Sequence, residues 1–168
     1  VWDMADVLFA LAATRQPDQP ETLLGTSGTD TLVGAGGDDF LSGGAGGDTY
    51  VFRRGDGSDV IEDNGSSSAT PADIIDIFGY TSAEVSFHRH PAAVNDLIIR
   101  FAGSQDRIHI VGGLATDTDY IETVRFEDGT TISYSVFDGA DPAVVILHGL
   151  AGSGREFIPT AHALAPRR

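Results

Sequence analysis

Aspartate side chains recur at nearly fixed spacing near the start of the chain, each two residues after a glycine. They are Asp30, Asp39, Asp48 and Asp59, separated by 9, 9 and 11 residues, and the glycines are Gly28, Gly37, Gly46 and Gly57. Glycine adopts backbone geometries that are forbidden to other residues, so such turns can aim successive carbonyl oxygens inward. Carboxylate and carbonyl oxygens are the ligands of hard divalent cations such as Ca²⁺. The spacing therefore indicates cation binding.

The aspartates belong to a nine-residue repeat that also carries a large apolar residue. The repeats cover residues 25–33, 34–42 and 43–51, followed after two residues by 54–62, and their eighth places hold Leu32, Leu41, Tyr50 and Ile61. A short strand in each repeat would send this side chain inward, and neighbouring turns must stack to bury it. Stacking brings rows of carboxylates together, which is repulsive unless a cation lies between them.

The repeats resemble G-G-x-G-x-D-x-U-x, the signature of the RTX (repeats-in-toxin) calcium-binding family. The resemblance implies a parallel β-roll with two repeats in each turn and calcium ions between alternate repeats. One ion would take carboxylates from Asp30 and Asp48, and the other from Asp39 and Asp59. The resemblance further implies backbone carbonyl ligands near Thr26, Gly28, Gly43 and Ala45 for the first ion, and near Ala35, Gly37, Arg54 and Asp56 for the second. Thr26, Ala35 and Arg54 stand where the signature has glycine, and the outer turns are expected to bind more weakly.

A different pattern follows from residue 73, where ordinary strands alternate with turns. Five or six strands are predicted, with Ile74–Phe78 apolar and with an Asp128-Gly129 hairpin turn. We expect these strands to pair in antiparallel fashion. The phrases DLIIRFAGSQDRIHI (96–110) and IETVRFEDGTTIS (121–133) resemble the segment that follows RTX repeats in haemolysin-type proteins. That resemblance implies a block that caps the roll and helps it to fold.

Composition excludes several classes of partner. The formal net charge is −15, with 10 basic and 25 acidic residues, which argues against nucleic acid and against anionic membrane surfaces. No apolar run is long enough for a membrane span. The chain has no cysteine, so bound metal would replace disulfides as a staple. His88 and His90 lie on one face of a predicted strand and could contribute to a zinc site, but the sequence offers no obvious third ligand. His109 is expected to be exposed.

Both ends of the chain differ from the middle in their pattern of apolar and polar residues. Residues 1–14 predict a short amphipathic helix ended by Pro17 and Pro20, unless they are the remnant of an upstream segment. Residues 143–147 (AVVIL) predict a buried parallel strand, and 148–154 a glycine-rich loop before a helix over 157–164. This tail resembles the oxyanion-loop segment that begins α/β-hydrolase domains, yet the chain contains no G-x-S-x-G nucleophile elbow. A structural appendage remains the alternative.

The sequence thus predicts a mainly β chain. Its parts are an N-terminal helix and linker (1–20), the RTX β-roll (21–63), a β-strand capping block (64–138) and an incomplete strand–loop–helix tail (139–168). The expected function is that of a secreted, extracellular calcium-binding module without catalytic residues of its own. It would fold on calcium after type I export and support an attached domain, with calcium ions and the type I secretion machinery as partners. The alternative is a fragment of a secreted esterase or lipase whose catalytic residues lie outside this chain.

Overall fold

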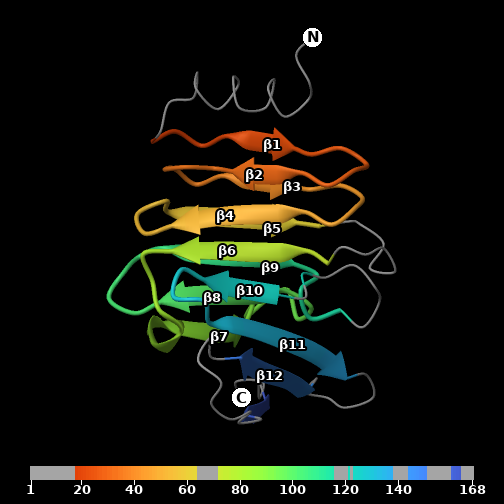
Figure 1. Cartoon of the computed structure of the whole chain (residues 1–168), viewed down its shortest axis with the longest axis vertical. Helices are drawn as coiled ribbons and strands as arrows, with labels where there is room; N and C mark the ends of the chain where they lie inside the picture. Colours follow the sequence, from red (N-terminus) through yellow and green to blue (C-terminus); the bar gives the residue numbers. More distant parts are fainter. Residues whose placement is uncertain are drawn as a thin grey trace.

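The strands of the molecule are stacked in two facing layers (Figure 1). The computed structural model describes residues 18–63, 72–115, 121, 123–137, 144–150 and 160–163. From residue 134 onward it describes the backbone and not the side chains. One sheet has the order β1 (Thr22–Leu24), β3 (Phe40–Ser42), β5 (Ser58–Glu62), β9 (Arg107–Val111), β8 (Leu97–Phe101), β7 (Val85–Arg89). The other has the order β13 (Thr160–Ala163), β12 (Val144–Leu150), β11 (Thr131–Phe137), β10 (Thr123–Phe126), β6 (Ile74–Phe78), β4 (Thr49–Arg53), β2 (Thr31–Val33).

Alternate strands of the repeats enter alternate sheets, so each turn of the chain adds one strand to each layer. β1, β3 and β5 pair in parallel in one sheet, and β2, β4 and β6 pair in parallel in the other. The eighth-place residues point inward as predicted, because Leu32, Leu41, Tyr50 and Ile61 are each at most 4% exposed. The predicted parallel β-roll with two repeats per turn is therefore confirmed.

The block after the repeats continues both sheets of the roll instead of forming an antiparallel sheet of its own. β9 lies parallel to β5, and β10 lies parallel to β6. Antiparallel pairing occurs further along, at β7·β8, β8·β9 and β10·β11. The expectation of antiparallel pairing throughout was wrong at the junction. The edges of β5 and β6 each need a further strand to satisfy their backbone groups, and the alternation of apolar residues in the sequence fixes the faces of that strand but not its direction.

A single apolar core runs through the roll and the block. Buried residues come from both parts: Tyr50 and Ile61 of the roll are 1% and 2% exposed, and in the block Ile75, Ile77, Ile99, Ile108, Ile121 and Val124 are 0% exposed. Phe52 of β4 stacks on Phe101 of β8 with ring centroids 5.1 Å apart, and Tyr80 stacks on the same ring at 4.2 Å. Because these contacts join the two sheets, folding of the repeats and of the block should be coupled.

The tail differs from the prediction. The apolar run forms strand β12 (Val144–Leu150), but β12 pairs antiparallel with β11 and β13, not parallel. The predicted glycine-rich loop begins inside β12, and β13 (Thr160–Ala163) lies where a helix was expected. A hairpin that extends the free edge of β11 satisfies backbone groups along that edge, and periodicity alone does not separate a short helix from a strand.

The predicted N-terminal helix and residues 151–159 lie outside the described residues. No helix in the described part of the chain is long and apolar enough to cross a membrane.

Candidate metal centre

Rows of aspartates line up where the turns enter the strands. In the row before β2, β4 and β6, the Asp30 N–H donates to Asp48 Oδ1 at 2.8 Å, and the Asp48 N–H donates to Asp73 Oδ1 at 2.6 Å. In the row before β3 and β5, the Asp39 N–H donates to Asp59 Oδ1 at 3.1 Å. One carboxylate oxygen of each acceptor therefore ties a turn to its neighbour, because the strands of successive turns lie in register.

Burial concentrates negative charge in these rows. The buried charged side chains in the described part of the chain are all aspartates: Asp30, Asp39, Asp48, Asp56, Asp59, Asp63, Asp73 and Asp106. No buried Lys or Arg accompanies them among those residues. A protein usually pairs a buried charge or binds a metal with it.

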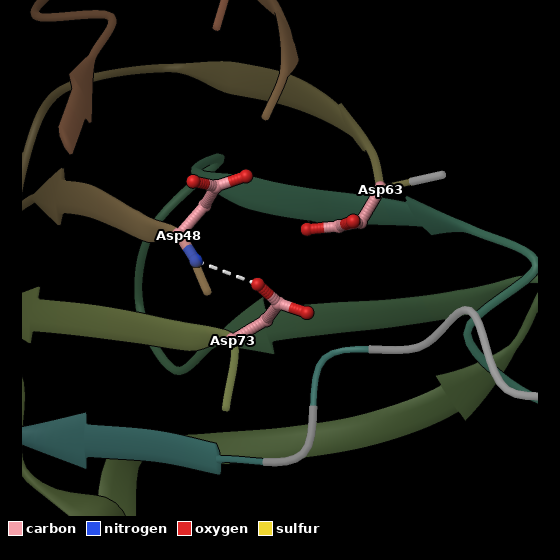
Figure 2. Close-up of side chains that lie close together, drawn as sticks. All are labelled: Asp48, Asp63 and Asp73. Carbon is pink, nitrogen blue, oxygen red and sulfur yellow. Dashed lines mark hydrogen bonds between the residues drawn. The ribbon is translucent and has the colours of Figure 1, made fainter. Parts of the chain in front are cut away.

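Three carboxylates converge at the end of the first row. Asp48 and Asp73 precede β4 and β6, whereas Asp63 follows β5 in the opposite sheet, and all three point into one space (Figure 2). One oxygen of each lies within 4.8 Å of the others, and all three side chains are buried. Burial raises the pKa of Asp48, and the charges of Asp63 and Asp30 raise it further.

Tyr50 fixes one member of this cluster. The phenol donates to Asp63 Oδ2 at 2.7 Å and accepts the Gly43 N–H at 2.9 Å. Burial, followed by the Asp63 charge, raises the pKa of Tyr50, so the phenol stays protonated and donates. Tyr50, which occupies the eighth position of the third repeat, therefore also orients the Asp63 carboxylate.

The second row is equally crowded. Burial, followed by the charges of Asp39, Asp56 and Asp38, raises the pKa of Asp59 to about 8. The pKa of Asp56 is also raised, mainly by burial, although its Oδ2 accepts the Arg53 N–H at 2.7 Å. A cation placed among these groups would favour their charged forms.

The turns need glycine because the carboxylates occupy the space where a side chain would lie. A methyl group at Gly43 would overlap Asp48 Oδ2 and the Tyr50 hydroxyl, and one at Gly34 would overlap Asp39 Oδ2. Asp48 Oδ2 is buried and has no hydrogen-bond partner among the described residues. Asp48 Oδ2 thus lies in a space that has no room for another side chain. A buried carboxylate oxygen that accepts no hydrogen bond is a suitable ligand for a cation.

Most of the predicted carbonyl ligands lie between alternate repeats. The Thr26 and Gly28 carbonyls adjoin Gly44 and Gly46 of the third repeat, and the Ala45 N–H donates to the Thr26 carbonyl at 3.1 Å. Gly37 forms a parallel bridge with Gly57 of the fourth repeat. The Gly43 carbonyl adjoins Gly25 of the first repeat. The structure therefore brings the first repeat against the third and the second against the fourth.

Three predicted ligands have features that the repeat did not suggest. Ala35 adopts a positive φ of 65°, the geometry that glycine would supply in its place. The Arg54 guanidinium lies 3.8 Å from the centroid of the Tyr80 ring and bonds the Gly79 carbonyl. Asp56 is buried, and its charge is one of those that raise the pKa of Asp59.

Sequence reasoning missed Asp63 and Asp73. Asp73 stands two residues before buried Ile75, as Asp48 stands two before Tyr50, so the D-x-U part of the signature was present. The interval of 25 residues from Asp48 concealed it, because the preceding repeats keep intervals near nine.

The histidines form no zinc cluster in the described part of the chain. His88 is exposed, with its Nε2 bonded to Ser86 Oγ at 2.9 Å. His90 stacks on His109 with ring centroids 4.9 Å apart, and His109 Nε2 lies 2.7 Å from Asp96 Oδ2. The expectation that His109 is exposed was wrong, because these two contacts leave its side chain 24% exposed.

A parallel β-roll with buried aspartate rows at its turns defines a calcium-binding repeat protein. Comparison with protein families agrees: residues 20–50 match the RTX calcium-binding nonapeptide repeat (4 copies), and residues 96–135 match the haemolysin-type calcium binding protein related domain. These segments are RTX repeats and their associated domain, and RTX repeats bind Ca²⁺. Such repeats are typically non-catalytic, and proteins that carry them are typically secreted by bacteria. Neither match reaches the tail, and no curated protein matches the chain.

Proposed function

We propose that this chain is a calcium-dependent folding module of a secreted bacterial protein, with residues 21–63 as the ion-binding roll and 64–138 as its cap. The observation that carries the proposal is the set of buried aspartates without buried basic residues in the described part of the chain. Without metal these carboxylates repel one another and must be desolvated, which destabilises the fold. A cation that binds only the folded state stabilises it by mass action.

The proposed ligands follow the contacts between alternate repeats. One ion uses Asp30 and Asp48 with carbonyls of the first and third repeats, and another uses Asp39 and Asp59 with carbonyls of the second and fourth. The placement of the Thr26 and Gly28 carbonyls against the third repeat supports the first assignment. The raised pKa of Asp59 beside the Asp39 and Asp56 charges supports the second, because a cation would relieve that repulsion.

Calcium concentration then serves as the folding signal. Inside a bacterium, where free calcium is low, the module stays unfolded and can pass through a type I secretion channel. Outside, calcium orders the roll, and the shared core carries that order into the block, since core residues of β4 and β8 stack on each other. The folded module then stabilises the domain attached to it.

A calcium titration of the chelator-treated chain, followed by far-UV circular dichroism, tests the proposal, with magnesium as the control. We expect a cooperative gain of β signal with calcium alone, and its loss when Asp39→Ala and Asp48→Ala are combined. A spectrum that does not respond to calcium would refute the folding switch, because the sheets would then form without the ion.

A further inference from the structure

The first turn beyond the repeats keeps the register of the roll. β6 pairs with β4 so that Thr49 lies opposite Ile74, which places Asp73 next to Asp48 in the same row. Asp63 comes from the opposite sheet, immediately after β5. Asp63 and Asp73, which lie outside the repeat sequence, therefore meet Asp48, the last aspartate of this row that belongs to a repeat (Figure 2).

The dimensions of this cluster suit calcium. Calcium ligands lie 2.3–2.6 Å from the ion, so two ligands on opposite sides are at most about 5 Å apart. The three carboxylate oxygens lie within 4.8 Å of one another. All three donors are oxygen atoms, whereas zinc sites favour nitrogen and sulfur.

An independent observation points to a ligand at this place. Asp48 is 1% exposed, its Oδ1 accepts the Asp30 N–H, and its Oδ2 has no hydrogen-bond partner among the described residues. Tyr50 holds Asp63 in position through a 2.7 Å hydrogen bond, and Asp73 is held by the Asp48 N–H at 2.6 Å. The cluster is thus built from fixed side chains, and one of its oxygens needs a partner.

We infer that Asp48, Asp63 and Asp73 bind a further Ca²⁺ at the junction between the roll and the block. The inference rests on the proposed calcium binding and extends it beyond the repeats. The ion joins the two sheets, because Asp63 follows a strand of one and the other two ligands precede strands of the other. It also joins the last repeats to β6, the first strand of the block.

Counting bound calcium tests this site. Equilibrium dialysis and calorimetric titration of the full chain would compare the unsubstituted chain with Asp63→Asn and Asp73→Asn, since asparagine keeps the acceptor oxygen and removes the charge. Asp128→Asn is the matched control, because Asp128 lies at an exposed turn where its Oδ1 accepts the Thr130 N–H. Each cluster variant should lose one bound ion per chain, or bind it at least about tenfold more weakly, and the control should change neither quantity.

Terbium luminescence gives a second reading that does not rely on counting ions, measured on variants that circular dichroism shows to be folded. Terbium can replace calcium and is excited through a nearby tyrosine, and the Tyr50 hydroxyl bonds a proposed ligand. Emission excited through tyrosine should fall severalfold in Tyr50→Phe and in Asp63→Asn. Tyr80→Phe is the control, because Tyr80 bonds Asp106 instead. Unchanged emission in both Tyr50→Phe and Asp63→Asn would overturn the inference.

The outcomes separate this inference from the proposed function. If the unsubstituted chain binds no calcium, both fail. If it binds calcium and both cluster variants bind as many ions with the same affinities, only the junction site fails. Circular dichroism at saturating calcium shows that a variant is folded before its ions are counted, and either of the two variants then gives the answer.

Discussion

Replacing Asp59 by asparagine should stabilise the metal-free fold while weakening calcium binding. The Asp59 side chain is 2% exposed, and its Oδ1 accepts the Asp39 N–H at 3.1 Å. Burial and the neighbouring Asp39, Asp56 and Asp38 charges raise its pKa to about 8 from an ordinary 3.8. Asparagine has nearly the same shape and keeps the acceptor oxygen but cannot ionise, so the change removes the titration of this side chain and little else.

The size and sign of the effect follow from that pKa. Between pH 4 and pH 8 the folded chain keeps a proton on Asp59 that the unfolded chain has lost. Asp59 therefore lowers the free energy of unfolding of the metal-free chain as pH rises through this window, contributing about 1.4 kcal/mol per pH unit. At pH 7, about three units above the ordinary value, ionisation of Asp59 in the unfolded chain removes about 4 kcal/mol of stability. Asp59→Asn should remove the contribution of Asp59 to the slope and recover up to that amount, while the raised pKa values of Asp48 and Asp56 leave a smaller slope of the same sign.

Because the metal-free chain is expected to be largely unfolded, its folding would be driven with the stabilising osmolyte TMAO at pH 5, 6 and 7 and followed by circular dichroism, which measures both quantities. Calcium would be removed by dialysis against a chelating resin, so that no chelator titrates within the range. At saturating calcium the order should reverse, because the variant has lost a ligand charge. Equal pH slopes for the two chains, or a metal-free variant that is no more stable at pH 7, would refute the argument that Asp59 is held in a repulsive site.

Four further substitutions test other parts of the structure. Gly43→Ala should reduce calcium-induced folding and destabilise the chain by about 1–3 kcal/mol, since its methyl group would overlap Asp48 Oδ2; calcium titration by circular dichroism measures this. Tyr50→Phe leaves buried partners without their hydroxyl and should lower the free energy of unfolding by about 1–3 kcal/mol in urea denaturation. Ile75→Ala, at a side chain that is 0% exposed, should lower it by about 2–5 kcal/mol. Arg54→Ala should cost less than about 2 kcal/mol in the same assay, because its ion pair is solvent-exposed and its stacking on the Tyr80 ring is partly so.

The roll could be predicted from the sequence because the structure of each repeat depends on residues within that repeat. A glycine two residues before an aspartate and an apolar residue two after it fix the turn, the row and the inward side chain. Leu32, Leu41, Tyr50 and Ile61 were all assigned to the core from this pattern, and all are buried there. The pairing of alternate repeats was also predicted, from the resemblance to RTX repeats, in which two repeats make one turn.

Pairing beyond the repeats could not be predicted in the same way. A strand's alternation fixes its faces but not the direction of its neighbour, so β9 and β10 gave no sign of lying parallel to β5 and β6. The four-residue strand at Thr160–Ala163 owes its state to pairing with β12, and such tertiary pairing overrides local helical propensity. Asp63 was missed because its role depends on the opposite sheet, which sequence spacing does not reveal.

Calcium bound at the acidic cluster, as inferred above, would let one signal fold both the repeats and the block. The proposed ligands of the first two ions lie in the repeats, whereas the described part of the block adds Asp73 to the row, and the shared core joins the block to the roll through contacts such as Phe52 on Phe101. With no ion present, the three carboxylates repel one another at the junction between roll and block. Repulsion therefore acts where the two parts join, and an ion there converts it into attraction. A calcium signal received by the roll can in this way decide whether the block folds onto it.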